Sequence, residues 1–339
     1  MSTAGLVELV RASIKRFGSE TEKAVFSTTD PDELAEVLIH HAGSHVAVVD
    51  RATFYRVGVG VVVGLRLVDG RSVVVKAHRW NASIARLGEV QRVQSHLADQ
   101  GLPAPRPLDR PRPLGRGCAT VEEQIDADDA DGHRTEVRQS VASTLHRFVD
   151  ASRSLGDVGV GSPAVITAPD EPLWPEPHDV RFDFDATSDG AEWIDTAAQE
   201  ARTTLHTVGA EDRVVGHFDW RTENLGFAGH EVSAIYDWDS VASADEAVVV
   251  GSAAAQFCAN WRRGHPVPSP EEIRRFVDDY QRARGRGFTE DEARRVDAAT
   301  TALVAYGARC QHSDRRLRPD LAAVHDHGWI DLLRALTGA

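Results

Sequence analysis

The pattern of apolar and polar positions changes twice along the chain, from short helical segments to β-branched runs and then to long helical periodicity. Residues 3–17 and 31–42 are predicted as two short helices. The second has boundary signals at both ends. Asp30 is a good N-cap, Pro31 suits the first helical position, and Gly43 is a typical stop. The chain is therefore expected to begin with a small helical segment.

β-branched residues dominate from Val46 to Ala77, in the runs VAVVD, VGVVVGLRLV and RSVVVKAH. Such runs predict strands, and Asp69-Gly70 between the last two is a strong hairpin signal. The next stretch, residues 81–101, has apolar side chains at helical spacing and ends at Gly101, which predicts a helix. These apolar positions are Ile84, Leu87, Val90, Val93 and Leu97.

The proline-rich residues 102–115 are interpreted as a connection, and CATVEEQI as a further strand. From about Ala127 onward the periodic segments are mostly helical, with a loop rich in Pro and Asp near residues 162–190. A β-rich part followed by a helical part predicts an α+β protein of two lobes with a cleft between them. The expected divisions are a helical extension (1–44), a β-rich lobe (45–125) and a helical lobe (126–339).

The composition limits the classes of partner. A net charge of −14 argues against nucleic acid, whose phosphates require clustered Lys and Arg. It would suit a cationic substrate, although acidic surfaces also simply keep proteins soluble. No apolar run approaches the roughly 20 residues that span a bilayer. The cysteines, Cys118, Cys258 and Cys310, have no paired spacing, which predicts a cytoplasmic protein without disulfides. A monomer or homodimer is expected.

One segment carries a pattern of chemically active residues. HFDWRTENLGF, residues 217–227, places an Asp two residues after a His and an Asn five residues after that Asp. The segment AIYDWDS follows, with Asp237 and Asp239. The intervening LGF and VSAIY predict a hairpin that would bring Asn224 and Asp237 together.

A second set of features lies upstream, in the β-rich part. YRVGVGVVVG is a glycine-bearing strand turn, and the strand after it contains Lys76 within VVVKAH. Only three lysines occur in the chain, so a lysine inside an apolar strand stands out. The helix that follows carries one glutamate, Glu89.

In this order, the features resemble the aminoglycoside phosphotransferase and choline kinase-like family, which shares the two-lobed protein-kinase fold. The resemblance covers roughly residues 46–260, and its most specific parts are residues 217–224 and 237–239. DWRTEN is also close to the DLKPEN type of catalytic loop in protein kinases. The resemblance implies an antiparallel sheet lobe, a helical lobe, Mg²⁺, and ATP as co-substrate, with GTP left open. The expected reaction is phosphoryl transfer to a hydroxyl of a small molecule.

The resemblance also assigns nucleotide-binding roles. Lys76 is similar to the strand lysine that contacts the α- and β-phosphates, and Glu89 is the expected partner that holds it. Gly58 and Gly60 would cover the phosphates. Three residues at the end of the last strand would meet the adenine through their backbone: Glu122, Glu123 and Gln124.

Asp219 stands where the family has its catalytic base, which accepts the proton of the substrate hydroxyl or orients that hydroxyl. Asn224 and Asp237 would bind Mg²⁺, because their oxygen atoms suit a hard ion. Arg221 replaces the loop lysine of protein kinases and could offset charge on the transferred phosphoryl group.

Two further residues would support the catalytic and metal-binding residues. His217 is predicted to act as a scaffold for the loop rather than as a proton carrier. Asp239 is interpreted either as an additional metal or substrate contact or as a structural carboxylate.

The phosphate acceptor is less defined. Asp183 and Asp185 lie in an acidic, aromatic segment that could grip an amine-bearing molecule or could be a solvated loop. Asn260 and Trp261 follow the metal motif and are candidate contacts, with Trp261 either stacking on a sugar or buried in the core.

An aminoglycoside or amino sugar is the favoured acceptor, as in an antibiotic-resistance enzyme. A metabolic kinase for a neutral sugar or small alcohol is the next alternative, followed by a catalytically silent nucleotide-binding module. A metal hydrolase would need more histidines at ligand spacing.

Overall fold

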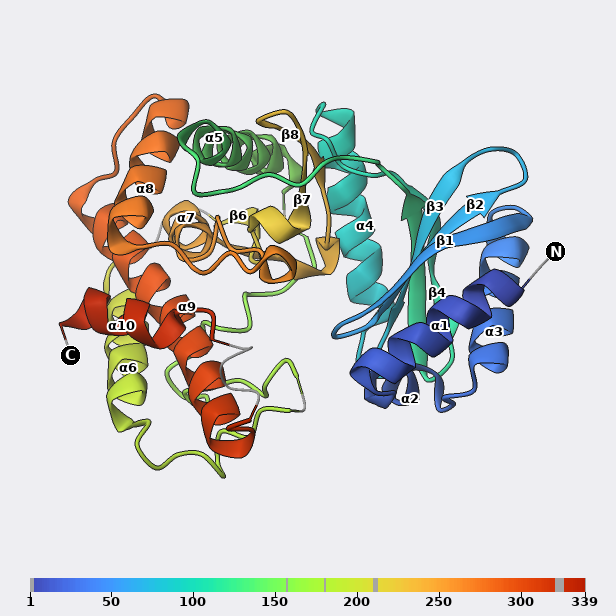
Figure 1. Cartoon of the computed structure of the whole chain (residues 1–339). Coiled ribbons are helices and arrows are strands. Elements are labelled where there is room, and N and C mark those ends of the chain that lie inside the picture. Colours follow the sequence, from blue (N-terminus) through green and yellow to red (C-terminus); the bar gives the residue numbers. More distant parts are fainter. Residues whose placement is uncertain (1–2, 157, 180, 210–212, 321–325, 339) are drawn as a thin grey trace. The chain divides into compact units, whose positions relative to one another are not determined.

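The β-branched runs form one antiparallel sheet in the computed structural model, which describes residues 3–156, 158–179, 181–209, 213–320 and 326–338. Its strands are β1 (Val49–Val57), β2 (Val61–Leu67), β3 (Ser72–His78), β4 (Pro107–Leu114) and β5 (Gly117–Glu123). They lie in the order β1-β2-β3-β5-β4. Figure 1 labels β1, β2, β3 and β4. The predicted hairpin between β2 and β3 is confirmed. Arg66 pairs with Ser72, and Gly70 has a φ of +90°, which glycine adopts without strain.

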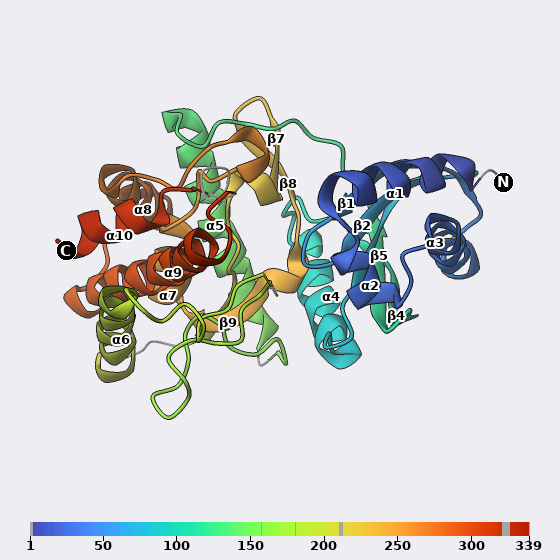
Figure 2. The same cartoon turned by 60° about the horizontal axis from the view of Figure 1, so that its bottom comes forward.

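The two faces of this sheet differ. One face packs against α1 (Ala4–Phe17), α2 (Glu20–Phe26) and α3 (Pro31–His45), and the other carries α4 (Ile84–Asp99) (Figures 1 and 2). Along β3, Val73, Val75 and Ala77 are fully buried, whereas Val74 and Lys76 are only partly covered. The face that packs against α1, α2 and α3 is thus the core of this part. Lys76 lies on the other face, which carries α4.

The predicted helices near the start of the chain are confirmed, with one change of boundary. Asp30 caps α3 by accepting hydrogen bonds from the backbone N–H groups of Asp32 and Glu33. The helix does not stop at Gly43 but continues to His45. A glycine inside a helix costs only about 1 kcal/mol, so it ends a helix only when the chain also turns there. The short α2 was not predicted, because seven residues are too few for a clear period.

The interpretation of residues 102–115 as a proline-rich connection is wrong, because most of this segment forms β4. Proline cannot donate a hydrogen bond to a neighbouring strand, so prolines normally argue against a strand. β4, however, lies at the edge of the sheet and pairs only with β5. Its pairing register shifts twice, between Pro107 and Asp109 and between Asp109 and Arg112. An edge position with irregular pairing accommodates the prolines.

The chain divides into two compact parts, here called the first unit (residues 1–99 and 104–126) and the second unit (100–103 and 127–339). The second unit is mainly helical, which together with the five-stranded sheet confirms the α+β class. The expected boundary between residues 1–44 and 45–125 stays a prediction. The helices of the second unit are α5 (Thr135–Ser152), α6 (Glu192–Thr207), α7 (Glu246–Ala254), α8 (Pro270–Arg284), α9 (Glu290–Leu317) and α10 (Trp329–Thr337).

The second unit also contains two small pairs of strands. β6 (Arg213–His217) pairs with β9 (Val241–Asp245), and β7 (Leu225–Ala228) pairs with β8 (Glu231–Ile235). Four short 3₁₀ helices complete it: η1 (Arg153–Leu155), η2 (Thr222–Asn224), η3 (Trp238–Ser240) and η4 (Trp261–Arg263). The predicted Pro- and Asp-rich loop is confirmed as irregular chain in residues 162–179 and 181–190.

All three cysteines are unpaired and buried. Among the described residues, none of the helices combines the length and the apolar character needed to cross a membrane.

Candidate active site

The segment with the His-x-Asp pattern leaves a short sheet and turns into η2. β6 ends at His217, which pairs with Val241 of β9. The loop that follows is anchored by Thr222, which is fully buried and donates from Oγ1 to the carbonyl oxygens of Cys258 (3.1 Å) and Ala259 (3.2 Å). Buried hydrogen bonds of this kind fix the backbone on either side of the loop.

His217 is buried and makes two hydrogen bonds with different ring nitrogens. Nε2 lies 2.8 Å from the carbonyl oxygen of Tyr236, and the backbone N–H of Asp219 donates to Nδ1 at 3.3 Å. A carbonyl requires a donor and an N–H requires an acceptor, so these bonds select the neutral ring with its proton on Nε2. The imidazole therefore ties the start of the loop to the residue before Asp237.

Asp219, Arg221 and Asn224 form one hydrogen-bonded group. The amide Nδ2 of Asn224 donates to Oδ2 of Asp219 at 2.7 Å and to its backbone oxygen at 3.0 Å. Arg221 Nη2 lies 3.2 Å from the same Oδ2. Within the described part of the chain, these contacts leave Oδ1 of Asp219 and Oδ1 of Asn224 without a hydrogen bond. Two oxygen acceptors are thus available at this loop.

The predicted hairpin after Asn224 is confirmed. Leu225 pairs with Ile235, and the N–H of Tyr236 donates to the carbonyl oxygen of Asn224 at 2.9 Å. Asp237 follows directly and has left-handed backbone angles (φ 62°, ψ 46°), a conformation that Asp tolerates better than most residues. Its Oδ2 accepts a hydrogen bond from Ser240 Oγ at 3.2 Å. The hairpin therefore sets Asn224 and Asp237 at its two ends.

This donor set fits Mg²⁺. An amide oxygen and a carboxylate are hard oxygen ligands, and Mg²⁺ usually takes few protein ligands and completes its shell with water and phosphate. No group of three or more His, Cys, Asp or Glu side chains that could hold a metal occurs among the described residues. In that part of the chain, a metal site built from such side chains alone, as in a hydrolase, is therefore not supported.

Arg221 also lies close to Trp261 and Glu223, of which the sequence identified only Trp261. Its guanidinium carbon lies 5.3 Å from the centre of the Trp261 ring, and Nη2 lies 3.9 Å from Glu223 Oε2. Glu223 also accepts from the backbone N–H of Trp261 (3.1 Å) and pairs with Arg262 at 3.1 Å. Nothing in the sequence pattern marks Glu223 or Arg262, because their roles depend on the return of a segment almost 40 residues away.

The other candidates of this region have structural contacts of their own. Asn260 is fully buried, and its Oδ1 caps η4 by accepting from the N–H of Arg263 at 3.2 Å. The Trp261 ring stacks on His327 with 4.0 Å between ring centres. A substrate contact for Asn260 and Trp261 stays a prediction, as does the role of Asp239, which lies partly buried in η3.

The acidic segment before α6 is attached to α9. Asp183 and Asp185 are both exposed, and Oδ1 of Asp183 accepts from the N–H of Ala186 at 2.9 Å. Arg309 of α9 is almost fully buried and donates to Thr187 Oγ1 (3.0 Å) and to the carbonyl oxygen of Phe184. The segment is thus an ordered feature with two exposed carboxylates.

His178 is a further residue of interest that the sequence analysis missed. Its Nδ1 lies 2.8 Å from the hydroxyl of Tyr306 on α9. Loss of hydration lowers the pKa of His178, with further electrostatic contributions that include Asp219, which raises it, and Arg221, which lowers it. His178 is thus attached to α9 through Tyr306, and no motif could have revealed this because the contact depends on how α9 packs.

In the first unit, the register of the sheet defines the surroundings of Lys76. It pairs with Val62 on β2 and with Thr120 on β5, so these side chains share one face. Glu122, two residues beyond Thr120, lies diagonally on the same face and accepts from Gln94 of α4 at 2.7 Å. Glu89 of α4 accepts from Arg92 at 2.5 Å. The predicted pairing of Lys76 with Glu89 stays a prediction, and Glu122 is a second carboxylate on that face.

The end of β5, predicted to meet the adenine, is already hydrogen-bonded. The N–H of Glu123 donates to the carbonyl oxygen of Arg106 at 2.9 Å, and that of Gln124 donates to Ser72 at 3.0 Å. A backbone contact between the adenine and Glu123 or Gln124 would therefore have to use the carbonyl oxygens of these two residues.

The predicted glycines lie in the turn between β1 and β2, where the N–H of Gly58 donates to the carbonyl oxygen of Gly60 at 3.0 Å. A Cβ added to Gly60 would lie 2.6 Å from the carbonyl oxygen of Ala77, so only glycine fits there. The turn is thus packed directly against the strand that carries Lys76.

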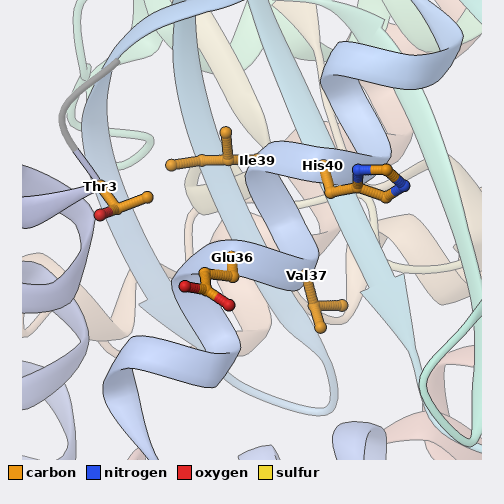
Figure 3. A pocket seen from close by; sticks show the side chains of 5 residues that line it. All are labelled: Thr3, Glu36, Val37, Ile39 and His40. Carbon is orange, nitrogen blue, oxygen red and sulfur yellow. The ribbon is translucent and has the colours of Figure 1, made fainter.

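A separate, open hollow lies on the N-terminal helices. It is lined by Thr3 and by four residues of α3, Glu36, Val37, Ile39 and His40 (Figure 3). None of the predicted site residues lines it. The hollow is therefore not part of the site described above.

Residues 57–296 match the model of the phosphotransferase enzyme family. No curated protein matches the chain.

Several solved structures are similar. Amicoumacin kinase hAmiN, in complex with AMP-PNP, Ca²⁺ and Ami, is 12% identical, with a TM-score of 0.59 over 87% of this chain and 93% of its own. A thermostable mutant of aminoglycoside phosphotransferase APH(4)-Ia is 16% identical (TM-score 0.54, 90% and 99% covered). Macrolide 2'-phosphotransferase MphH from Brachybacterium faecium is 15% identical (TM-score 0.51, 90% and 98% covered). At these identities the likeness establishes the fold only.

Proposed function

Because the chain belongs to the phosphotransferase enzyme family, we propose that it is a small-molecule kinase that transfers the γ-phosphate of ATP to a hydroxyl group. The observation that carries this proposal is the group formed by Asp219 and Asn224. The amide of Asn224 holds one carboxylate oxygen of Asp219 at 2.7 Å, and one oxygen of each side chain is left for ligands.

In the proposed reaction, the acceptor hydroxyl donates its hydrogen bond to Oδ1 of Asp219. The hydroxyl oxygen attacks the γ-phosphorus, and the bond from that phosphorus to the β–γ bridging oxygen breaks, which releases ADP. The hydroxyl proton passes to Asp219 and then to solvent. Such transfer depends on positioning and on neutralising charge. Arg221, fixed beside Asp219 at 3.2 Å, would offset charge on the transferred group.

Asn224 and Asp237 would hold Mg²⁺, with Asp239 as a possible third contributor, and His217 would keep the two segments in register. The ion would neutralise phosphate charge when bound. In the first unit, Lys76 would bind the α- and β-phosphates, supported by Glu89. Gly58 and Gly60 would cover the phosphates, and the adenine would meet Glu122, Glu123 or Gln124. AMP-PNP and a Ca²⁺ ion in the hAmiN complex support a nucleotide and a divalent metal.

For the acceptor, we propose an amine-bearing molecule such as an aminoglycoside or amino sugar. The net charge of −14 and the exposed carboxylates of Asp183 and Asp185 would favour a cation. Trp261 and Asn260 are further candidate contacts. A neutral sugar or small alcohol is the alternative acceptor.

The test is ADP release with Mg·ATP across aminoglycosides, amino sugars, neutral sugars and amino alcohols, with Asp219→Asn as the control. Acceptor-dependent release that falls by about 10²- to 10⁴-fold in the variant is expected for a positioned base. The variant should still bind AMP-PNP, because the amide keeps the shape of the carboxylate. An equally active variant would remove Asp219 from the mechanism. Nucleotide binding without turnover on any acceptor would favour a silent nucleotide-binding module.

A further inference from the structure

The turn that carries Gly58 and Gly60 is held by a residue outside the sheet. Thr21 of α2 donates a hydrogen bond from its hydroxyl to the carbonyl oxygen of Gly58 at 3.0 Å, across 37 residues of sequence. The turn itself is solvent-facing at Gly58 and Val59. A Cβ at Gly58 would meet no atom within 4 Å, so packing does not restrain that residue. The Thr21 hydroxyl therefore restrains Gly58, the residue of the turn that packing leaves unrestrained.

α2 is a firm support for this hydrogen bond. At its C-terminal end, Val25 is fully buried, and its carbonyl oxygen accepts from the N–H of Arg116 in the β4–β5 turn at 2.8 Å. One residue after Thr21, Glu22 is fully buried and accepts from the hydroxyl of Tyr55 on β1 at 3.1 Å. The helix is thus fixed to the sheet on both sides, and Thr21 projects from a rigid element.

The restrained turn lies beside the strand that carries Lys76. Gly60 is pressed against Ala77, the neighbour of Lys76, and Val61 pairs with Ala77. A glycine turn has many conformations, and ordering it around a ligand costs conformational entropy. A turn that is already fixed before the ligand arrives avoids part of that cost.

We propose that Thr21 is a positioning residue for nucleotide binding, and that α2 pre-orders the glycine turn that covers the phosphates. This inference rests on the proposed function, since it assumes that the turn meets a nucleotide. It assigns a role in ATP affinity to a helix that precedes the region matched by the family model, which begins at residue 57.

The experiment measures the Kd for AMP-PNP with Mg²⁺ in Thr21→Val, which keeps the shape and removes the hydroxyl. Loss of one hydrogen bond predicts a Kd raised roughly 2- to 10-fold. Thr21→Ser should bind like the parent. Thr28→Val is the matched control. It removes a similar threonine bond, to Glu33 at 2.7 Å, at the start of α3 and away from the turn. It should leave the Kd unchanged.

Hydrogen exchange supplies a second readout. Amides of residues 58–60 should exchange faster in Thr21→Val without nucleotide than in the parent, and those of α3 should not. If Thr21→Val does not fold, Thr21→Ala is measured in its place.

An unchanged Kd in a folded variant, or an equal rise in Thr28→Val, would overturn the inference and leave the proposed function intact. A parent protein that does not bind AMP-PNP would instead remove the proposed function, and this inference with it.

Discussion

The two units bury carboxyl groups in opposite ways. In the second unit, Glu292 pairs with Arg284 at 2.7 Å and Arg286 at 3.0 Å. Glu246 of the same network pairs with Arg284 at 2.9 Å and accepts from a tyrosine. In the first unit, Glu22 is equally buried, but the side chain that donates to it is the neutral hydroxyl of Tyr55. Its second oxygen has no hydrogen-bond partner in the described part of the chain.

The pKa values reflect this difference. Burial alone would raise the pKa of Glu292, but hydrogen bonds from Arg286 and Arg284 lower it to about 2. Burial raises the pKa of Glu22, and the hydrogen bond from Tyr55 only partly opposes that effect. Glu292 and Glu246 of the second unit are therefore compensated by arginines, whereas the first unit is most stable when Glu22 is uncharged.

The largest effect is expected where the second unit meets a charged ligand. Asp237→Asn removes a carboxylate charge while keeping a residue that tolerates the left-handed backbone (φ 62°). Residues that merely orient metal ligands cost 10- to 100-fold in metal affinity when changed, so loss of the negative charge of a direct ligand should cost on the order of 100-fold. The measurement is Mg²⁺-dependent binding of AMP-PNP by calorimetry. Unchanged affinity in a folded variant would exclude Asp237 as a metal ligand.

The next largest effect is expected on the stability of the second unit, when one of its buried ion pairs is broken. Arg295 is buried, pairs with Asp245 at 2.5 Å, and donates to the carbonyl oxygens of Leu205 (2.7 Å) and Val208 (2.8 Å). Arg295→Met leaves Asp245 buried and uncompensated, so the free energy of unfolding should fall by about 3–5 kcal/mol.

Its neighbour provides the control for that variant. Arg294 pairs with Asp291 at 2.6 Å, but both side chains are more than half exposed. Arg294→Met should therefore cost at most about 1 kcal/mol. Tryptophan fluorescence during urea unfolding measures both variants, because every tryptophan except Trp80 lies in the second unit. If both variants lost the same free energy of unfolding, the buried pair would contribute no more to stability than the exposed pair.

The pH dependence should have opposite signs in the two units. The pKa of Glu292 is lowered on folding, so its stabilisation is present above the unfolded value of 4.5 and is lost as the pH falls toward 2. A shift of that size corresponds to roughly 3 kcal/mol at pH 7. Glu292→Gln should show this loss at pH 7 and little change at pH 2, by the same fluorescence assay.

The pKa of Glu22 is raised on folding, so its ionisation destabilises the first unit as the pH rises above 4.5. Glu22→Gln keeps the acceptor for Tyr55 and removes the ionisation. It should stabilise α2 and β1 at pH 8 and have no effect at pH 4, as measured by hydrogen exchange of their amides. A variant that is less stable at pH 8 would contradict the raised pKa.

The sequence predicted the parts of the fold and site that depend on local pattern. β-branched runs identified β2 and β3, the segment CATVEEQI was interpreted as the strand β5, and the spacing from His217 to Asn224 located the loop around Asp219. The Asn224–Asp237 hairpin followed from the strand-like LGF and VSAIY segments.

The missed features depend on contacts between distant segments. β4 was not predicted, because its prolines are tolerated only in an edge strand and no local pattern reveals that a strand lies at an edge. Glu223, His178 and Thr21 are hydrogen-bonded to Trp261, Tyr306 and Gly58, which lie 37 to 128 residues away in sequence. Side chains of this kind can be identified only once the packing is known.

The prolines of β4 also bear on contacts between molecules. This strand forms one open border of the sheet, and three of its eight residues, Pro107, Pro111 and Pro113, have no N–H group. A strand from another molecule that approached this border would find few donors to pair with. Natural sheets avoid edge-to-edge aggregation in this way. The irregular strand that escaped prediction thus protects the sheet from intermolecular β-pairing.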